Sequence, residues 1–381
     1  MAALEPADAR EAAEMIRQAG ADGRRLEIRG GGSKAAYGAC DPPPATVLDT
    51  RRMAGVIDYD PQEFVLTAGA GATLSDIEPL LAAHGQRLGF EPPDLGPLLG
   101  AAAGQATLGG VIAANLSGPR RILAGAARDH FLGFEAVSGR GVVFKAGGRV
   151  VKNVTGFDLP KLMAGSWGAL ALLTSVTLRT QPAPRASATL RLHPIGEAQA
   201  VSAMGAAMRA PLEVSAAAWL DRTLFLRLEG FGASVAARVT RLSAAMGGYG
   251  GVETLTAIEA DETWRGIAAL AALTGKPGGL WRISVPPASG AQVAEMIGAQ
   301  DAPRLIDWAG GLVWMRLDAA RAGQVRAVAE QLGGHATLVL ADGVRDAPAF
   351  HPQSPAQTAL ADRVRTAFDP GRVFVDRRGS A

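Results

Sequence analysis

Short apolar runs separated by glycine, proline and charged residues predict a chain that alternates strands and helices. Strands are expected in LEIR (26–29), ATVLD (45–49) and FVLTAG (64–69), followed by a helix over 75–84 that Thr73 or Ser75 can cap. From 131 to 180 the pattern becomes strand-rich. The polar N-terminus lacks an apolar core, which predicts an amphipathic surface helix rather than a signal peptide.

Beyond QPAPR (181–185), where two prolines mark a linker, the pattern repeats itself. Strand, helix, two strands, helix and strand follow one another over 187–257, and the same order returns over 280–341. Each copy is a split ferredoxin-like unit, and two units side by side would form one antiparallel sheet with helices on one face. We therefore predict an α+β fold with domains 1–182 and 186–341. A C-terminal segment, 342–381, is expected to return to the first domain through the amphipathic helix AQTALADRVRTAF.

Two glycine clusters, RGGGSK (29–34) and ATLGGVIAANLSGPRR (106–121), indicate a site for a large anion. After a strand, successive glycines can take positive φ and expose consecutive amides, the geometry that binds phosphate. The second cluster lies in a segment without a charged residue from Leu95 to Pro119, which indicates buried backbone. A cofactor with a pyrophosphate and a flat apolar ring would need both the exposed amides of the first cluster and the buried backbone of the second. A dinucleotide motif at Gly69 and Gly71 is not favoured, because Leu74 stands where the third glycine belongs.

Composition narrows the class of protein. The 381 residues, 48% of them hydrophobic, suffice for two or three domains, and a formal net charge of +2 makes nucleic acid an unexpected partner. The single cysteine, Cys40, excludes an internal disulfide and an iron–sulfur centre within this chain, and favours the cytoplasm. The uncharged stretches 95–119 and 162–178 are interrupted by polar residues, so no transmembrane segment is expected. Peripheral attachment to the cytoplasmic face of the inner membrane through a partner stays open.

The paired clusters resemble the FAD-binding domain of the vanillyl-alcohol oxidase (PCMH-type) superfamily, and AGAGATLSDIEPLLAAHG is similar to its expected helix. Within that superfamily, VVKNVTGFDLPKLMAGSWGALALLTSVTLR (150–179), GGHATLVL and FDPGRVF resemble the glycolate oxidase FAD-binding subunits. The resemblance implies a two-part FAD domain followed by a cap domain. It also implies FAD as the cofactor, held noncovalently, because Ser33 and Lys34 stand where covalent relatives carry a histidine.

The resemblance also implies which residues contact FAD. Backbone from Gly165 to Leu173 would pass near the adenine and the isoalloxazine, with Trp167 where many relatives have glutamate. For two of the implied residues, Asn115 and Ser117, hydrogen bonds within a turn before Gly118 are an alternative role for the side chain. Lys152, Asn153 and Thr155 are candidates for a cofactor or subunit contact. The implied cofactor-binding set is Gly30, Gly31, Gly32, Ser33, Lys34, Thr107, Gly109, Gly110, Asn115, Ser117, Gly165 and Leu173.

The histidine pattern bears on catalysis. Catalytic relatives carry an HxGDGNxH-like cluster, whereas HATLVLADG retains only His335, and the five histidines are scattered. We therefore assign no catalytic residue and no metal. The resemblance implies the FAD-binding subunit of a glycolate oxidase complex, which oxidises glycolate or D-2-hydroxy acids to 2-oxo acids. Catalysis would lie mainly in a homologous FAD-dependent subunit, and an iron–sulfur subunit would carry the electrons away. A stand-alone FAD-dependent D-2-hydroxy-acid oxidoreductase and a flavin-free assembly module are the alternatives.

Overall fold

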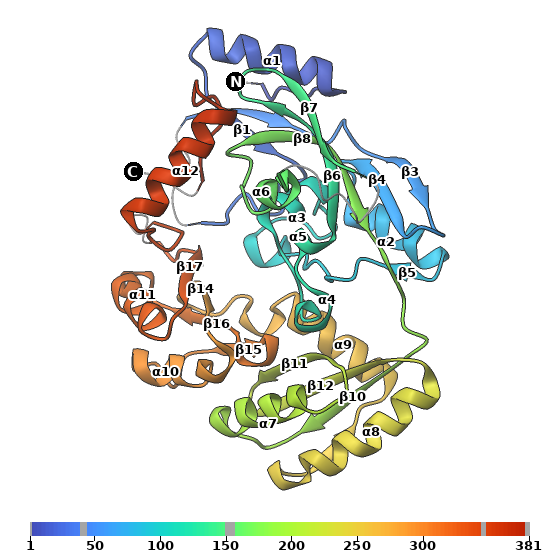
Figure 1. The fold of residues 1–381 in the computed structure, drawn as a ribbon. Helices are drawn as coiled ribbons and strands as arrows, with labels where there is room; N and C mark the ends of the chain where they lie inside the picture. The colour runs from blue at the N-terminus through green and yellow to red at the C-terminus, as the bar shows by residue number, and fades with distance from the viewer. Residues whose placement is uncertain (1, 39–43, 149–156, 344–347, 378–381) are drawn as a thin grey trace.

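The computed structural model describes residues 2–38, 44–148, 157–343 and 348–377. Cys40 and the candidates Lys152, Asn153 and Thr155 lie outside these ranges. The described chain forms a front domain, drawn in blue to green in Figure 1, and a second domain, drawn in yellow-green to orange below it. The red helix α12 (Pro355–Phe368) lies beside the front domain, so the chain returns to where it began.

The front domain combines helices with two sheets. In the smaller one, β1 (Leu26–Arg29) pairs in parallel with β2 (Thr46–Asp49). The larger sheet is antiparallel in the order β3 (Val56–Asp60), β4 (Val65–Gly69), β8 (Ala171–Arg179), β6 (Phe131–Ser138) and β7 (Val143–Gly147). A short pair joins β5 (Gln86–Arg87) and β9 (Gln181–Pro182). The helices are α1 (Ala9–Ala21), α2 (Leu74–Ala83), α3 (Leu108–Ala114), α4 (Arg121–Ala124), α5 (Ala127–His130) and α6 (Leu159–Met163).

Helix starts in this domain follow the local sequence. The Thr73 hydroxyl accepts a hydrogen bond from the Asp76 N–H at 3.2 Å, so α2 begins where its cap predicts. Asp8 caps α1 by accepting from the N–H groups of Glu11 and Arg10, and these bonds lower the pKa of its carboxyl. One buried face of α1, which includes Ile16, packs with Leu26, Leu48 and Phe374.

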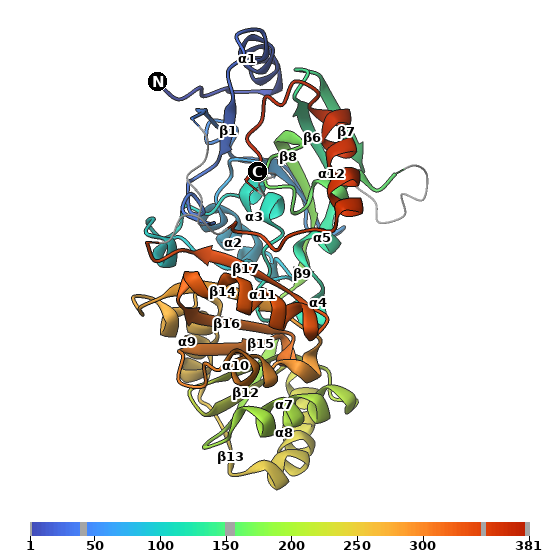
Figure 2. The same cartoon turned by 90° about the vertical axis from the view of Figure 1, so that its left-hand side faces the viewer.

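The second domain contains the two predicted units. The first runs β10 (Ala186–Leu192), α7 (Glu197–Arg209), β11 (Val214–Leu220), β12 (Thr223–Gly230), α8 (Gly232–Met246) and β13 (Val252–Thr254). The second runs β14 (Gly279–Ser284), α10 (Gln292–Ile297), β15 (Arg304–Asp307), β16 (Leu312–Leu317), α11 (Ala322–Gln331) and β17 (His335–Leu340). Strands β11 and β15 pair in antiparallel fashion and join the units into one eight-stranded sheet, β13-β10-β12-β11-β15-β16-β14-β17. In Figure 2, β17 lies nearest the front domain and β13 farthest from it.

The two faces of this sheet are covered differently. The four repeat helices bury one face around Trp281, Leu226 and Met315. The other face packs against the front domain and against α9 (Ala257–Ala268), which the sequence analysis missed. A capping box between Thr256 and Glu259 marks the start of α9 and was the available signal. The prediction of helices on one face therefore needs correction: it holds for the repeat helices, while the connection between the repeats covers the opposite face.

A buried ionic network joins the two domains. The carboxylate of Glu229 on β12 accepts from Arg87 and from Arg120, both at 2.8 Å, and Arg227 on the same strand donates to Glu91 at 2.7 Å. Burial alone would raise the pKa of Glu229, but the hydrogen bond from Arg87 and the surrounding arginine charges lower it to about 2. Each carboxylate is thus paired, which keeps the buried charges satisfied and fixes how the domains meet.

The C-terminal segment is anchored by a buried carboxylate. Asp369, fully buried at the end of α12, accepts from the N–H groups of Val373 and Phe374, both at 2.9 Å. The chain then runs beside β1, where the Leu26 N–H donates to the Val373 carbonyl and the Val375 N–H to the Leu26 carbonyl. The tail therefore extends the small sheet of the front domain.

Replacing Asp369 with alanine should lower the free energy of unfolding by about 2–4 kcal/mol, because two buried N–H groups would lose a charged acceptor. Chemical denaturation measures the loss. Asp362→Ala is the matched control, since Asp362 forms only a half-exposed ion pair with Arg372 and should cost less than about 1 kcal/mol. Equal losses in both variants would show that Asp369 does not anchor the tail.

Candidate functional site

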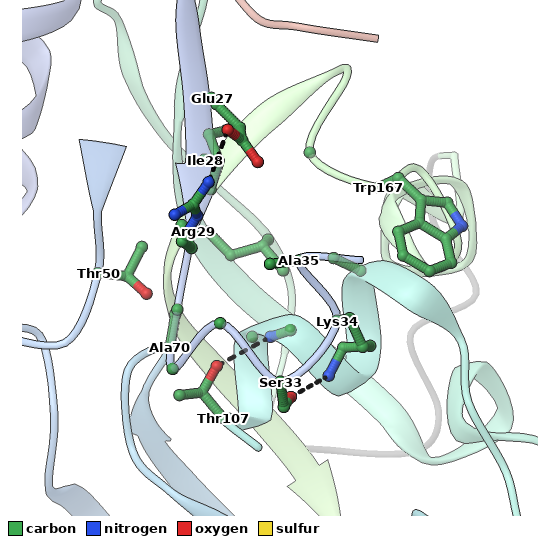
Figure 3. Close-up of a pocket in the computed structure, with 18 of the residues that line it drawn as sticks. Glu27, Ile28, Arg29, Ser33, Lys34, Ala35, Thr50, Ala70, Thr107 and Trp167 are labelled. Atoms are coloured by element: carbon green, nitrogen blue, oxygen red, sulfur yellow. Dashed lines mark hydrogen bonds and ion pairs between the residues drawn. The ribbon is translucent and has the colours of Figure 1, made fainter. Parts of the chain in front are cut away.

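A cleft with about 780 Å³ of empty space, part of it open to solvent, lies in the front domain where the two glycine clusters meet. Figure 3 shows its labelled side chains. The lining comes from β1, the two glycine clusters, the loop before β8, β8 itself and the C-terminal tail: Glu27, Ile28, Arg29, Gly30, Gly31, Gly32, Ser33, Lys34, Ala35, Thr50, Ala70, Thr107, Gly109, Gly110, Ala113, Ser166, Trp167, Gly168, Ala171, Leu173 and Arg377.

The first glycine loop owes its composition mainly to close packing. Of its three glycines, Gly32 alone has a positive φ, 75°, so the expectation of positive φ at Gly30 and Gly31 is wrong. A Cβ at Gly31 would lie 1.8 Å from the Gln105 carbonyl oxygen, and one at Gly30 would lie 2.3 Å from Thr107 Oγ1. Both glycines are required because the first loop presses against the backbone and side chains of the second.

This loop presents backbone donors to the cleft. Within the described chain, the N–H groups of Gly31, Gly32 and Ser33 donate no hydrogen bond to another protein group. Ser33 itself is buried, with a side chain that accepts from Lys34 Nζ at 3.1 Å. Unsatisfied amides in a partly buried loop need an acceptor, and an anion supplies several acceptor atoms at once.

Lys34 contributes a positive charge to the cleft, whose lining also includes Arg29 and Arg377, both paired with Glu27. Burial lowers the pKa of its ammonium to about 8, opposed only by the charge of Asp94. No carboxylate forms an ion pair with it in the part of the chain that the structure describes. The desolvated Lys34 ammonium, beside loop N–H groups that lack a protein acceptor in the described chain, favours the binding of a phosphate group.

The second glycine loop closes on the first. Thr107 caps α3, accepting from the Gly110 N–H at 3.3 Å. A Cβ at Gly109 would lie 2.8 Å from the Ala70 carbonyl oxygen, so this glycine lets α3 approach the end of β4. A Cβ at Gly110 would lie 3.6 Å from Lys34 Nζ, which places Gly110 directly beside the cation.

The opposite wall is largely apolar. Ala171 and Leu173 of β8 line it, and Trp167, with a φ of 55°, lies at its edge. The Trp167 ring packs 4.5 Å from Tyr37 and 5.6 Å from Phe350, centroid to centroid. The residue that replaces the glutamate of many relatives therefore makes an aromatic cluster beside the cleft instead of a polar contact.

Arg377 reaches the cleft from the other end of the chain, and the sequence analysis missed it. Its guanidinium donates to the carbonyl oxygens of Lys34 at 3.2 Å and Ala35 at 3.0 Å, and it pairs with Glu27. It lies 343 residues from Lys34, and no local sequence pattern signals such a contact. The C-terminal tail thus holds the first glycine loop in place.

Nine of the twelve predicted cofactor-binding residues line this cleft, and Asn115, Ser117 and Gly165 do not. Asn115 ends α3 in the left-handed conformation and accepts from the Arg128 N–H at 3.1 Å, while the Ser117 hydroxyl accepts from the Ala127 N–H at 2.9 Å. The Gly165 N–H donates to the Ile112 carbonyl oxygen. These three residues connect α3 to its neighbours. The side-chain bonds of Asn115 and Ser117 reach residues 13 and 10 positions further along the chain, rather than closing the turn before Gly118.

The described residues contain no group of three or more His, Cys, Asp or Glu side chains placed to hold a metal ion. His335 lies at the start of β17, away from the cleft lining. Partial desolvation and the charges of Arg282, His351 and Arg121 lower its pKa. In the ranges described, no helix has the length and apolar character to cross a membrane.

Comparison with known proteins decides the family. Residues 1–147 match the family model described as FAD binding domain. The chain is 36% identical over 366 residues to "Glycolate oxidase subunit GlcE" of Escherichia coli (strain K12), which covers 95% of this chain and 96% of that protein. This chain belongs to the GlcE family. The sequence resemblance to glycolate oxidase FAD-binding subunits is therefore confirmed.

Other relatives share the front half. "D-lactate dehydrogenase" of Archaeoglobus fulgidus is 34% identical over 48% of this chain and 39% of its own length. "Glycolate oxidase subunit GlcD" of Bacillus subtilis (strain 168) is 30% identical over 42% of this chain and 33% of its own length. A solved structure of alkyldihydroxyacetonephosphate synthase matches with a TM-score of 0.69 at 16% identity, over 97% of this chain and 75% of that one. The last match bears on the fold alone, and it confirms the predicted PCMH-type α+β architecture.

FAD is the cofactor of this domain, and the residues of the cleft fit it. The free N–H groups of the first glycine loop and the unpaired ammonium of Lys34 suit a pyrophosphate, while Leu173, Ala171 and Trp167 offer an apolar wall to a flat ring.

FAD affinity should fall as the pH rises above about 8. In the free protein Lys34 loses its proton near that pH, whereas a bound phosphate favours the charged form, so binding must then take up a proton. The dissociation constant, measured by FAD titration between about pH 6 and pH 9.5, should rise by up to about tenfold per unit above pH 8.

Lys34→Met should bind FAD more weakly at neutral pH and lose this pH dependence. Lys161→Met is the matched control, because Lys161 is an exposed lysine paired with Asp158 on α6. Identical pH profiles for Lys34→Met and the unmodified protein would exclude Lys34 from the phosphate site.

Proposed function

We propose that this chain is the FAD-binding subunit of a glycolate oxidase complex that converts glycolate or another D-2-hydroxy acid into the 2-oxo acid. The observation that carries the proposal is similarity along nearly the whole chain to a protein named as a glycolate oxidase subunit. The similarity of the front half to a D-lactate dehydrogenase supports the class of substrate.

Within this proposal, the first glycine loop and Lys34 bind the FAD pyrophosphate, and Thr107, Gly109 and Gly110 complete that wall. Leu173 and Ala171 lie against a flat ring and exclude water from it. Arg377 keeps the loop closed from outside by its bonds to the Lys34 and Ala35 carbonyl oxygens. Bound FAD supplies the two-electron acceptor for oxidation of the hydroxyl carbon.

The main catalytic centre is proposed to lie in a homologous FAD-dependent subunit. Hydroxyl oxidation needs a base for the proton, and this chain retains only His335 of the histidine motif that catalytic relatives carry. The similarity to a protein named glycolate oxidase subunit GlcD fits a related partner. With one cysteine this chain holds no cluster of its own, so electrons would leave through an iron–sulfur subunit. We place the complex in the cytoplasm, with attachment to the inner membrane through those partners.

Flavin reduction tests the partner dependence. The chain is purified alone and also after co-expression with a homologous flavoprotein subunit and an iron–sulfur subunit, and each sample is mixed with glycolate or D-lactate without oxygen. The visible flavin band should bleach in the complex and persist in the isolated chain. Bleaching of the isolated chain would instead establish a stand-alone oxidoreductase, and absence of flavin from both samples would favour an assembly module.

FAD is proposed to bind noncovalently. Acid precipitation of the purified protein should leave the flavin in the supernatant, because Ser33 and Lys34 provide no ring nitrogen for a covalent link. Yellow colour retained in the washed pellet would contradict this.

A further inference from the structure

Two arginines from different domains share one tryptophan. Arg121 belongs to α4 of the front domain and Arg282 to β14 of the second domain. Their Cζ atoms lie 4.3 Å and 5.1 Å from the ring centroid of Trp308, which sits in the turn between β15 and β16. The guanidiniums are close enough to repel each other electrostatically.

Neither cation has an anionic partner. Over the described ranges, no carboxylate forms an ion pair or hydrogen bond with Arg121 or Arg282. Asp129 attracts Arg121 only at a distance, and its own oxygens accept from the Ala126 N–H at 2.8 Å and lie 3.8 Å from Arg128. Burial lowers the pKa of both arginines. Two like charges that are partly buried without a counter-ion repel each other, and a bound anion offsets that repulsion.

The position of Trp308 between these cations is maintained against backbone strain. Trp308 and Ala309 are successive non-glycine residues with positive φ, 51° and 55°. The buried carboxylate of Asp307 accepts from the Trp308 N–H at 2.7 Å, and the indole Nε1–H donates to the Gly118 carbonyl oxygen of the front domain at 3.1 Å. A bulky residue in this conformation is uncommon, and such strain gathers at ligand sites.

The cluster lies beside the cofactor cleft. Arg282 interacts electrostatically with Tyr37, whose ring packs against Trp167 at the edge of the cleft. His335 also faces both arginines, and after partial burial their charges help to lower its pKa. A small anion held here would therefore contact both domains and lie next to the aromatic edge of the flavin site.

We propose that Arg121 and Arg282 form a carboxylate-binding site between the two domains of this chain, which holds the carboxylate of a small 2-hydroxy or 2-oxo acid. Guanidinium groups match the planar carboxylate with paired hydrogen bonds. The acid class rests on the proposed function. The two cations and their shared tryptophan do not depend on it.

Oxalate, a small dicarboxylate, is the probe. Calorimetric titration of the FAD-loaded chain with oxalate should show binding, and oxalate should raise the thermal midpoint. Arg282→Gln and Arg121→Gln should each weaken binding about tenfold or more, because each loses a charged hydrogen-bond donor. Arg265→Gln, an exposed arginine on α9, is the matched control and should bind as the unmodified protein does.

The thermal midpoint of each arginine variant, measured without oxalate, distinguishes a ligand site from a structural contact. In a ligand site, removing one of two repelling cations leaves the thermal midpoint unchanged or raises it, whereas loss of a structural contact lowers it. A lowered midpoint in Arg282→Gln together with undiminished oxalate binding would overturn the proposal. So would stabilisation by inorganic phosphate without any by oxalate.

FAD content and co-purification with the partner subunits are measured on the same preparations. If FAD is bound and the complex forms but oxalate does not bind, the carboxylate site is wrong and the proposed function stands. If oxalate binding depends on both arginines while the complex does not form, the proposed function fails and the site stands.

Discussion

Backbone-to-backbone contact between the two glycine loops is the constraint on which the front domain depends. The first loop approaches the Gln105 carbonyl so closely that a Cβ at Gly31 would overlap it, and Gly109 permits α3 to approach Ala70, where a Cβ would lie 2.8 Å from the carbonyl oxygen. These contacts bring Lys34 beside Gly110 and leave loop N–H groups without protein partners. The same packing that excludes side chains therefore creates the donors and the charge that an FAD pyrophosphate requires.

The second domain is held against the front domain by paired charges as well as by apolar packing. Glu229 accepts from Arg87 and Arg120 of the front domain, and Glu91 of the front domain accepts from Arg227. Arg120 takes part in this network, whereas its neighbour Arg121 pairs with no carboxylate among the residues that the structure describes. Over the same described residues, one side of the interface has paired charges, and the other has two arginines around Trp308 without a carboxylate partner.

Membership of the GlcE family links the FAD-binding front domain of this chain to its second domain. A GlcE-type chain combines an FAD-binding front domain with a cap built from two ferredoxin-like units, and this chain lacks most of the histidine motif of catalytic relatives. The proposed function assigns the base to a partner subunit, and in the proposed carboxylate site the cap would enclose an anion. The ionic network between the domains fixes the position of the cap relative to the front domain.

Much of this protein follows from local sequence. The apolar strand runs, the cap at Thr73 and the repeated strand–helix order predict most of the strands and most of the longer helices, because propensity and capping act over a few residues. Strand β3 and the short helices α3, α4 and α5 were not predicted. The glycine clusters likewise predict the cleft, since a missing Cβ marks close approach. Helix α9 was missed although its capping box was visible, and the side chains of Asn115 and Ser117 accept from the Arg128 and Ala127 N–H groups, 13 and 10 residues further along the chain. Only the tertiary structure brought Arg377 to the first glycine loop and placed Arg121 and Arg282 on one tryptophan. Such contacts between separate elements depend on how whole sheets pack, which no short pattern encodes.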